Sequence, residues 1–379
     1  MTFIAAGFRP ASLRISSLLI LIAMLPTLGA QPHPEFIFQP GSAPFASSHA
    51  STLVELNDGS LLAAWFGGTG EGYRDVAIWS SHRVNAAWSA PVEIAREPNT
   101  PCWNPVLFRT KGHRLWLFYK FGPSPSTWTA ARKFSDDDGK TWSRAEHLPA
   151  GLVGPVRAKP LVLSDGAIVS GASIESYLSW AAWIERSTDN GKTWTKFGPI
   201  VPPLGSFDQS LGSIATDAAS QDPDAEDWKR TFGIIQPSVV SLGGKHLRLY
   251  ARSTTTIARI AVADSYDNGV TWTAAHLLDL PNPNSGIDAV ALKDGRVVLV
   301  YNNTTSGRTP LNLAVSNDGE HFKMFLTLED LPGEYSYPAM ISDSGGDLDI
   351  TYTWQRKAIR YVHIPLSAIP SSAAPRDSR

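Results

Sequence analysis

The stretch that decides the fold is a repeated hairpin pattern, which first reads STLVELNDGSLLAAWF at residues 51–66. Two apolar runs flank an Asp-Gly pair, and glycine accepts the positive φ that a tight hairpin turn needs. The pattern returns five times, with turn glycines at positions 59, 112, 166, 244, 295 and 346. Repeats of about 50 residues, each long enough for four strands, predict an all-β chain folded as a six-bladed β-propeller of four-stranded antiparallel blades.

A second motif follows several of the hairpins. It reads Ser-x-Asp-x-Gly-x-Thr-Trp and begins at Ser135, Ser187 and Ser265, with a worn copy at Ser316. Its Asp carboxylate can accept backbone N–H groups across the turn, while its Trp packs between strands. One Asp per turn offers too few oxygens for calcium, and the lone Cys102 excludes a zinc site built from cysteines. We therefore predict no metal and no cofactor.

The spacing of the turn glycines also locates an insertion and the ends of the domain. The step from position 166 to 244 is longer than the others, which places a polar, acidic insertion at 206–231, either a surface loop or a lid. The last repeat lacks the Ser-x-Asp motif, so residues 35–39 are expected to supply its outermost strand. An N-terminal strand at this position closes the ring of blades and leaves no open sheet edge. The predicted propeller domain is therefore 31–379.

Residues 1–30 differ from the rest of the chain. They hold no acidic residue, carry Arg9 and Arg14 before an apolar run, and end in small residues at Ala30. This pattern is typical of a secretory signal peptide, the alternative being a short uncleaved anchor. No later segment is apolar enough to span a membrane, and a net charge of −2 gives no reason to expect a nucleic-acid partner. We expect a secreted or periplasmic bacterial protein that is a monomer.

Polar residues open the inner strands of the predicted blades, where a propeller has its central funnel. In blade order these residues are His49, Asn104, Lys159, Gln236, Asp288 and Tyr337. The ends of the second strands add Lys120, Glu175, Arg252, Asn302, Trp354 and Arg356, and nearby loops add Glu71, Asp75, Arg157, Arg308 and Glu334. These cations outnumber what a neutral sugar needs, so we expect a small anionic ligand.

The Ser-x-Asp-x-Gly-x-Thr-Trp motifs resemble the Asp-box repeats of the sialidase superfamily, and the resemblance covers essentially all of 31–379. Sialidases clamp the substrate carboxylate with three arginines, use an Asp as acid/base and attack the sugar with a Tyr that a Glu activates. The resemblance implies that Tyr337 is the nucleophile and that Arg308 is the third arginine. It offers either Arg252 or Arg259 as the second arginine, and Glu71 at the acid/base position, with Asp75 as its alternative.

Two departures from the sialidase pattern bear on the mechanism. His49 stands where the family has its first arginine, and Gln236 stands where it has the Glu that pairs with Tyr. A phenol with an ordinary pKa of about 10 needs a base to become a nucleophile, and Gln cannot supply one. Asp288 or Glu334 could substitute.

Three functions remain open at this stage. The first is an exo-glycosidase of sialidase type that releases a terminal acidic sugar from a glycan. The second is an enzyme on the same scaffold in which His49 acts as acid/base on a uronic-acid-containing or rhamnose-capped glycan, by hydrolysis or elimination. The third is a glycan-binding propeller without activity. In each case we expect the acidic glycan to contact Asn104, Lys120, Lys159, Gln236, Asn302 and Trp354, although Trp354 could instead pack between blades and Asp75 could cap a turn.

Overall fold

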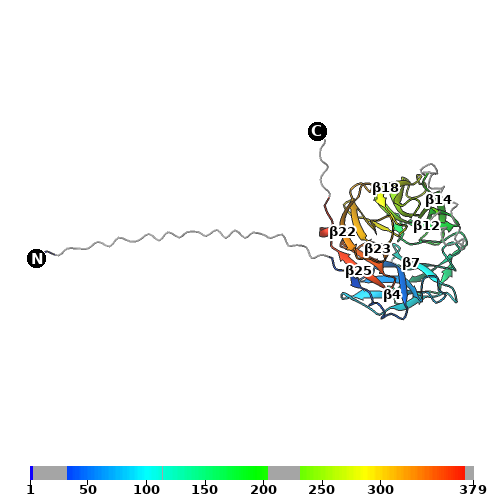
Figure 1. Ribbon diagram of the computed structural model, residues 1–379, viewed down its shortest axis with the longest axis horizontal. Coiled ribbons are helices and arrows are strands. Elements are labelled where there is room, and N and C mark those ends of the chain that lie inside the picture. Colours follow the sequence, from blue (N-terminus) through cyan, green and yellow to red (C-terminus); the bar gives the residue numbers. More distant parts are fainter. Residues whose placement is uncertain (3–31, 113, 204–230, 372–379) are drawn as a thin grey trace, which may run out of the picture. The chain divides into compact units, whose positions relative to one another are not determined.

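A computed structural model describes residues 1–2, 32–112, 114–203 and 231–371, and the described residues from 32 onward belong to one compact unit (Figure 1). The predicted signal peptide lies outside the described residues except for its first two positions. The predicted insertion at 206–231 lies outside them except for Thr231. Apart from one 3-10 turn, η2 (Leu366–Ala368), the regular elements of the described residues are strands. The prediction of an all-β chain is confirmed. Within the described residues, no helix is long and apolar enough to cross a membrane.

The strands form sets of antiparallel neighbours that follow the sequence repeats. The first set has β2 (Ser47–Glu55), β3 (Leu61–Gly68) and β4 (Ala77–Val84), with both β5 (Ala87–Trp88) and β6 (Val92–Ala95) on β4. The second has β7 (Cys102–Arg109), β8 (Leu115–Phe121), β9 (Thr129–Ser135) and β10 (Glu146–His147). The third has β11 (Leu161–Val162), β12 (Ile168–Ser176), β13 (Ser179–Ser187) and β14 (Thr195–Ile200).

The second half of the chain repeats this order. The fourth set has β15 (Phe232–Gly243), β16 (His246–Ser253), β17 (Arg259–Ser265) and β18 (His276–Pro281). The fifth has β19 (Asp288–Ala291), β20 (Val297–Asn302), β21 (Leu311–Ser316) and β22 (Lys323–Glu329). The sixth has β23 (Tyr335–Ser342), β24 (Leu348–Trp354), β25 (Ala358–Ile364) and β1 (Glu35–Phe36). A short parallel contact between β13 and β15 joins the third and fourth sets into one sheet.

Both ends of the unit meet in the sixth set. Glu35 pairs with Tyr361 and Phe36 with Arg360, and the Ile37 N–H donates to the Ile359 carbonyl at 2.9 Å. The N-terminal strand therefore completes the last set, as the sequence predicts, although its paired part is only two residues long.

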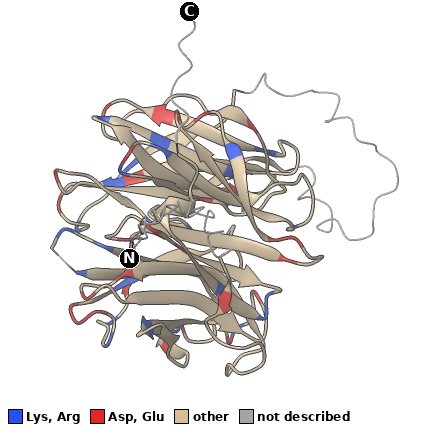
Figure 2. Cartoon of the chain, turned by 90° about the vertical axis from the view of Figure 1, so that its left-hand side faces the viewer, with Lys and Arg blue, Asp and Glu red and all other residues tan. Residues whose placement is uncertain are grey.

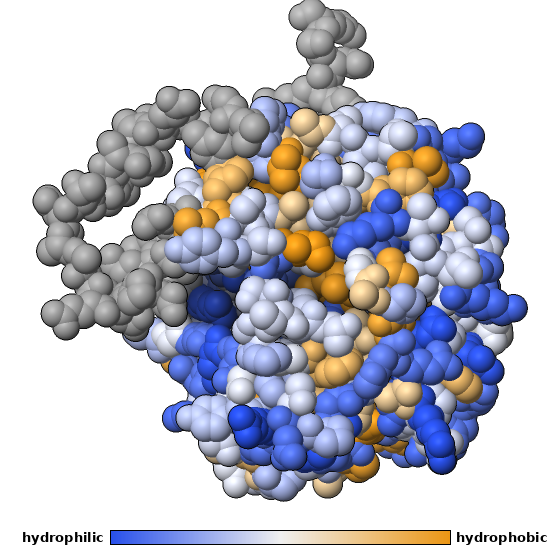
Figure 3. All heavy atoms as spheres, turned by 90° about the vertical axis from the view of Figure 1, so that its right-hand side faces the viewer, coloured by the Kyte–Doolittle hydropathy of each residue, from blue (hydrophilic) through white to orange (hydrophobic). Residues whose placement is uncertain are grey.

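Apolar clusters lie between neighbouring sets. Each set shares a cluster with the next along the chain, and Leu53 and Trp65 of the first set pack with Ile359 and Tyr361 of the sixth. Burying a large aliphatic or aromatic side chain contributes about 1.5–3 kcal/mol, so these seams hold the sets together. On the outside, Lys and Arg positions are interspersed with Asp and Glu (Figure 2). The face in Figure 3 mixes hydrophilic and hydrophobic side chains.

The Ser-x-Asp motifs have the local structural role that their residue types predict. In the third set, Ser187 Oγ accepts the Gly191 N–H at 2.8 Å and donates to Asp189, whose carboxylate accepts the N–H and hydroxyl of Thr193. The indole Nε1 of Trp194 donates to the Gly191 carbonyl at 3.1 Å. The motif thus ties its own turn to the sheet edge.

Replacing Ser187 with alanine should therefore lower the free energy of unfolding. The hydroxyl is buried and bonds to the Asp189 carboxylate and to the N–H groups of Asp189 and Gly191, so its loss should cost about 1–3 kcal/mol. Urea denaturation measures this change. The exposed Ser164 serves as the control, because Ser164→Ala should stay within about 0.5 kcal/mol of the unaltered protein. Equal stability of both variants would contradict the role of the motif.

Candidate functional site

The inner strands carry a repeated β-bulge. On β2, β7, β15 and β23 the pairing register shifts, and one residue at each shift has a positive φ. These residues are Ala50 (55°), Asn104 (35°), Gln236 (56°) and Tyr337 (51°). Proline follows three of them and cannot donate to the sheet ladder. A bulge re-aims its side chain, and left-handed backbone at a residue other than glycine is costly and concentrates at functional sites.

Tyr337 is the centre of a cluster of arginines. Its hydroxyl oxygen accepts a hydrogen bond from Arg252 Nη1 at 2.6 Å, and the same nitrogen donates to Gln236 Oε1 at 3.2 Å. The guanidinium carbons of Arg157, Arg308 and Arg252 lie 5.3, 5.5 and 5.6 Å from the centre of its ring. Three positive side chains therefore surround one phenol.

Arg157 is the most deeply buried of these arginines, with 1% of its surface exposed. Its Nη2 donates to the Pro338 carbonyl, but Nε and Nη1 have no hydrogen-bond partner among the described residues. Burial lowers the pKa of this guanidinium to about 10, against the attraction of Asp288 and Tyr337. A buried charge with unpartnered donors is costly, so this arrangement favours an anion as the missing partner.

Arg308 and Arg356 differ from Arg157 because they have carboxylate partners. Arg308 donates to Glu334 at 3.0 Å, and Arg356 donates to both Glu334 oxygens and to Glu71. Burial alone would raise the pKa of Glu334, but the hydrogen bond from Arg356 and the charges of both arginines lower it. Arg252 has no carboxylate partner within the described chain, since it donates to Tyr337, Gln236 and Asn284.

His49 packs directly on Tyr337, with 4.2 Å between their ring centres. Its Nδ1 is 2.9 Å from Thr353 Oγ1, while its buried Nε2 has no hydrogen-bond partner in the described structure. Burial, and then the charges of the surrounding arginines, lower the pKa of His49 well below 6.5. The imidazole is therefore neutral at neutral pH.

Asp288 and Lys159 lie together beneath the cluster. Lys159 Nζ donates to both Asp288 oxygens at 3.1 Å, Ser238 Oγ donates to one at 2.6 Å, and the Met340 N–H donates to the other at 2.8 Å. Internal donors thus occupy both oxygens of a carboxylate that is 1% exposed. The bonds tie together the third, fourth, fifth and sixth sets.

Lys120 and Asn302 also have internal partners. Lys120 is fully buried, donates to the Pro155 carbonyl at 2.6 Å, and has a pKa lowered to about 7 by burial. It therefore supports the segment that carries Arg157. Asn302 donates to the carbonyls of Pro310 and Tyr335 at 3.0 and 2.9 Å. Asn104 is buried at its bulge.

Three further candidates have partners away from Tyr337. Asp75 accepts the Thr69 N–H at 2.8 Å and caps its loop. Arg259 is half exposed and lies 3.5 Å from Asp279, so Arg252 rather than Arg259 is the arginine that contacts Tyr337. Trp354 packs edge-on against Phe36 of its own set at 5.2 Å and also against the apolar cluster that the fifth and sixth sets share, so it lies at a seam. Glu71 to Asp75 line an open hollow of about 580 Å³.

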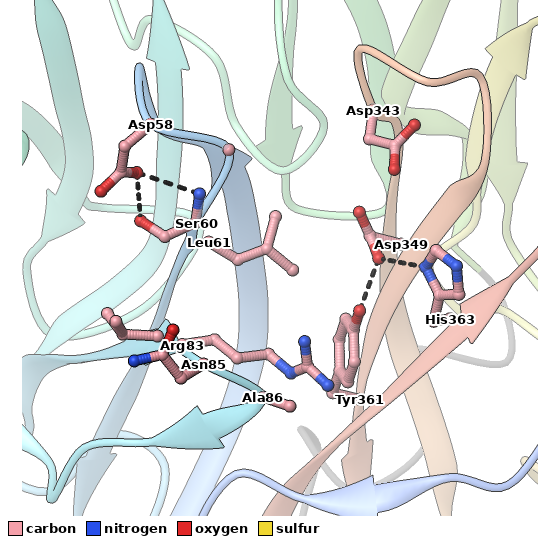
Figure 4. Close-up of a pocket in the computed structure, with 12 residues that line it drawn as sticks. Asp58, Ser60, Leu61, Arg83, Asn85, Ala86, Asp343, Asp349, Tyr361 and His363 are labelled. Carbon is pink, nitrogen blue, oxygen red and sulfur yellow. Dashed lines mark hydrogen bonds and ion pairs between the residues drawn. The ribbon is translucent and has the colours of Figure 1, made fainter.

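A separate cavity of about 390 Å³ lies between the first and sixth sets (Figure 4). Asp343, Asp349 and His363 bring potential metal-ligand atoms within 4.8 Å of one another there. Asp349, however, accepts hydrogen bonds from Tyr361 at 2.6 Å and His363 Nδ1 at 3.0 Å, and Asp343 caps the Gly346 and Asp347 N–H groups. The cluster has internal bonds that account for its arrangement.

Sequence reasoning placed Arg157 near the funnel but gave it no role, and it missed Asn284 and Thr353. The position of Arg157 two residues before Lys159-Pro160, at the start of an inner strand, was the available signal. No comparable signal marks Asn284 or Thr353, because their partners Arg252 and His49 come from distant parts of the chain.

Comparisons with known proteins agree with this architecture. Residues 59–350 match the family model of the BNR repeat-like domain. The NanB sialidase of Streptococcus pneumoniae superimposes with a TM-score of 0.67 at 15% identity, over 89% of this chain and 71% of that one. A protein of unknown function from Dyadobacter fermentans gives 0.68 at 14% identity, over 88% and 98%. The Ruminococcus gnavus intramolecular trans-sialidase gives 0.65 at 14% identity, over 89% and 98%.

No curated protein matches the sequence. At these identities the structural likeness shows the fold, whereas the family model spans most of the chain. The chain therefore belongs to the BNR repeat-like domain family and has the all-β fold of the sialidases.

Proposed function

We propose that the six strand sets are the blades of a six-bladed propeller and that the protein is an exo-glycosidase of sialidase type, releasing a terminal acidic sugar from a glycan. The observation that carries the proposal is the pair of buried arginines, Arg157 and Arg252, which face Tyr337 without a carboxylate partner among the described residues. A sugar carboxylate supplies the missing charge and accepts the free guanidinium N–H groups.

Tyr337 and His49 supply the chemistry in this proposal. Arg252 holds the Tyr337 oxygen, from which the phenol attacks the anomeric carbon. Gln236 cannot take the phenolic proton, and the carboxylates of Asp288 and Glu334 are occupied by internal donors. Neutral His49 packs on Tyr337 with a free Nε2, so it is the proton acceptor when Nδ1–H donates to Thr353. Arg308 and Arg356 add two more positive charges to this site.

The same histidine supports a second candidate function. A neutral, unpartnered Nε2 could instead serve as the acid/base for a uronic-acid-containing or rhamnose-capped glycan, with Tyr337 only lining the pocket. In either case the partner is an acidic glycan, the site needs no cofactor, and we propose a secreted or periplasmic monomer.

The test is release of a fluorophore from an α-sialoside by the purified protein, with Tyr337→Phe beside it. We expect turnover by the unaltered protein and a loss of roughly 10³-fold or more in kcat/KM for Tyr337→Phe, because the nucleophile is removed. Tyr301→Phe is the matched control, since Tyr301 is a buried tyrosine of β20, and it should keep full activity.

Two results would overturn the sialidase-type proposal. Turnover that survives in Tyr337→Phe but is lost in His49→Ala would favour the second candidate. Saturable binding of acidic glycans with no turnover in any variant would leave a binding protein.

A further inference from the structure

Glu175 lies at the same edge as the Tyr337 cluster, at the end of β12. It pairs with Trp180 across the hairpin to β13, and Trp180 pairs with Gly233 across the parallel contact to β15. The guanidinium carbon of Arg252 lies 5.9 Å from the Trp180 ring, and Arg252 reaches the Tyr337 oxygen. Glu175 and Arg252 end the second strands of consecutive sets, which brings them to one edge.

The carboxyl group of Glu175 is free to exchange a proton. Its Oε1 is buried and has no hydrogen-bond partner among the described residues. Burial raises the pKa of Glu175 to about 7; the charge of Arg252 opposes the shift and that of Glu71 adds to it. Protonated and ionised forms therefore coexist at neutral pH, which suits a group that must give and later take a proton.

The other acidic candidates are engaged elsewhere. Glu71 is paired with Arg356, Asp75 caps the Thr69 N–H, and Glu334 is held by two arginines. The arginine contacts lower the pKa of Glu334, which makes it a poor proton donor at neutral pH, while Glu71 and Asp75 already accept donors from the protein. Among these acidic groups near the arginine cluster, Glu175 alone keeps an unpartnered buried oxygen in the described structure.

We propose that Glu175, rather than Glu71 or Asp75, donates the proton to the glycosidic oxygen. The inference rests on the proposed function. In the first step the Tyr337 oxygen bonds to the anomeric carbon while His49 takes the phenolic proton, the glycosidic C–O bond breaks, and the departing oxygen keeps the electron pair and takes the Glu175 proton. In the second step water attacks the same carbon, the Tyr337 oxygen leaves with the electron pair and regains its proton from His49, and the Glu175 carboxylate takes a proton from that water.

The pH dependence follows from the required form of Glu175. The first step needs the protonated acid, so that step should weaken as pH rises through about 7. The charged groups that act on Glu175 from the described elements are Arg252 on β16 and Glu71 after β3. The fall should therefore be absent when Glu175 is replaced by glutamine.

The test is Glu175→Gln, assayed on two α-sialosides that differ in their leaving group. Sialyllactose, whose sugar alcohol needs protonation, should lose roughly 10²–10⁴-fold in kcat/KM. The 4-nitrophenyl sialoside, whose phenolate leaves unaided, should lose less than about tenfold. The fall in sialyllactose rate as pH rises through about 7 should be absent from the residual activity of Glu175→Gln. Glu185→Gln is the matched control in the same blade, because that buried carboxylate accepts the Val153 and Gly154 N–H groups. It should change stability without changing the ratio between the two substrates.

Equal losses on both substrates, or an unchanged pH profile in Glu175→Gln, would overturn the assignment while leaving the sialidase-type function in place. If Glu71→Gln shows the leaving-group dependence instead, Glu71 is the acid. Absence of turnover in the unaltered protein on either sialoside would overturn the proposed function and, with it, the role of Glu175.

Discussion

Replacing Arg157 with methionine should stabilise the protein by about 1–2 kcal/mol and weaken its binding of sialic acid by roughly 100-fold or more. The two effects have one cause. The guanidinium is buried with two unpartnered nitrogens, and its lowered pKa of about 10 shows that the folded protein disfavours its charge. Methionine fills similar space without a charge, at the expense of one hydrogen bond to Pro338.

The measurements are urea denaturation without ligand and calorimetric titration with sialic acid. Arg356→Met is the control, because it removes an arginine that is paired with Glu334 and Glu71 and should therefore lower stability. Lower stability in Arg157→Met with unchanged sialic acid binding would show that Arg157 stabilises the fold and does not bind an anionic ligand.

Replacing Asp288 with asparagine should destabilise the protein by about 1–3 kcal/mol, because it removes a buried carboxylate that accepts internal donors and leaves the partly buried Lys159 without its counter-ion. Lys159 Nζ and the Met340 N–H both point at the Asp288 carboxylate, so the substitution loosens several sets at once. Thermal and urea unfolding measure the loss.

The double variant Lys159→Met/Asp288→Asn provides the control. Removing both charges should recover part of the stability. Replacing both members of an ion pair with neutral groups costs little, whereas removing one member leaves the other charge uncompensated. A loss below about 1 kcal/mol in Asp288→Asn would contradict the structural role of the pair.

The elements of the fold were predictable because their signals are local. Asp-Gly and Gly-Gly turns between apolar runs specify hairpins within some fifteen residues, and the Ser-x-Asp motif specifies its own turn. The N-terminal strand was predicted in place but too long, since only Glu35 and Phe36 pair with β25. No sequence signal indicated that both β5 and β6 would pair with β4.

The site was only partly predictable, because a side chain's role depends on partners from distant repeats. The polar residues at the strand starts were found, yet Lys159 and Asp288 bind one another, whereas Tyr337 and Arg252 meet across 85 residues of chain. The sequence pattern does not show whether a carboxylate already binds donors from the protein itself. The resemblance offered Glu71 as the acid/base and gave Glu175 no role, whereas in the structure Arg356 binds Glu71 and Glu175 keeps an unpartnered oxygen.

The pairing of β1 with β25 has a consequence for biosynthesis. Tyr361 is synthesised 326 residues after its partner Glu35. The sixth sheet therefore cannot be completed until Tyr361 has been made, and nascent intermediates before that point expose the seam that Leu53 and Trp65 later share with Ile359 and Tyr361. A contact of such long sequence separation forms slowly, so this seam is where chaperone binding and aggregation should compete with folding.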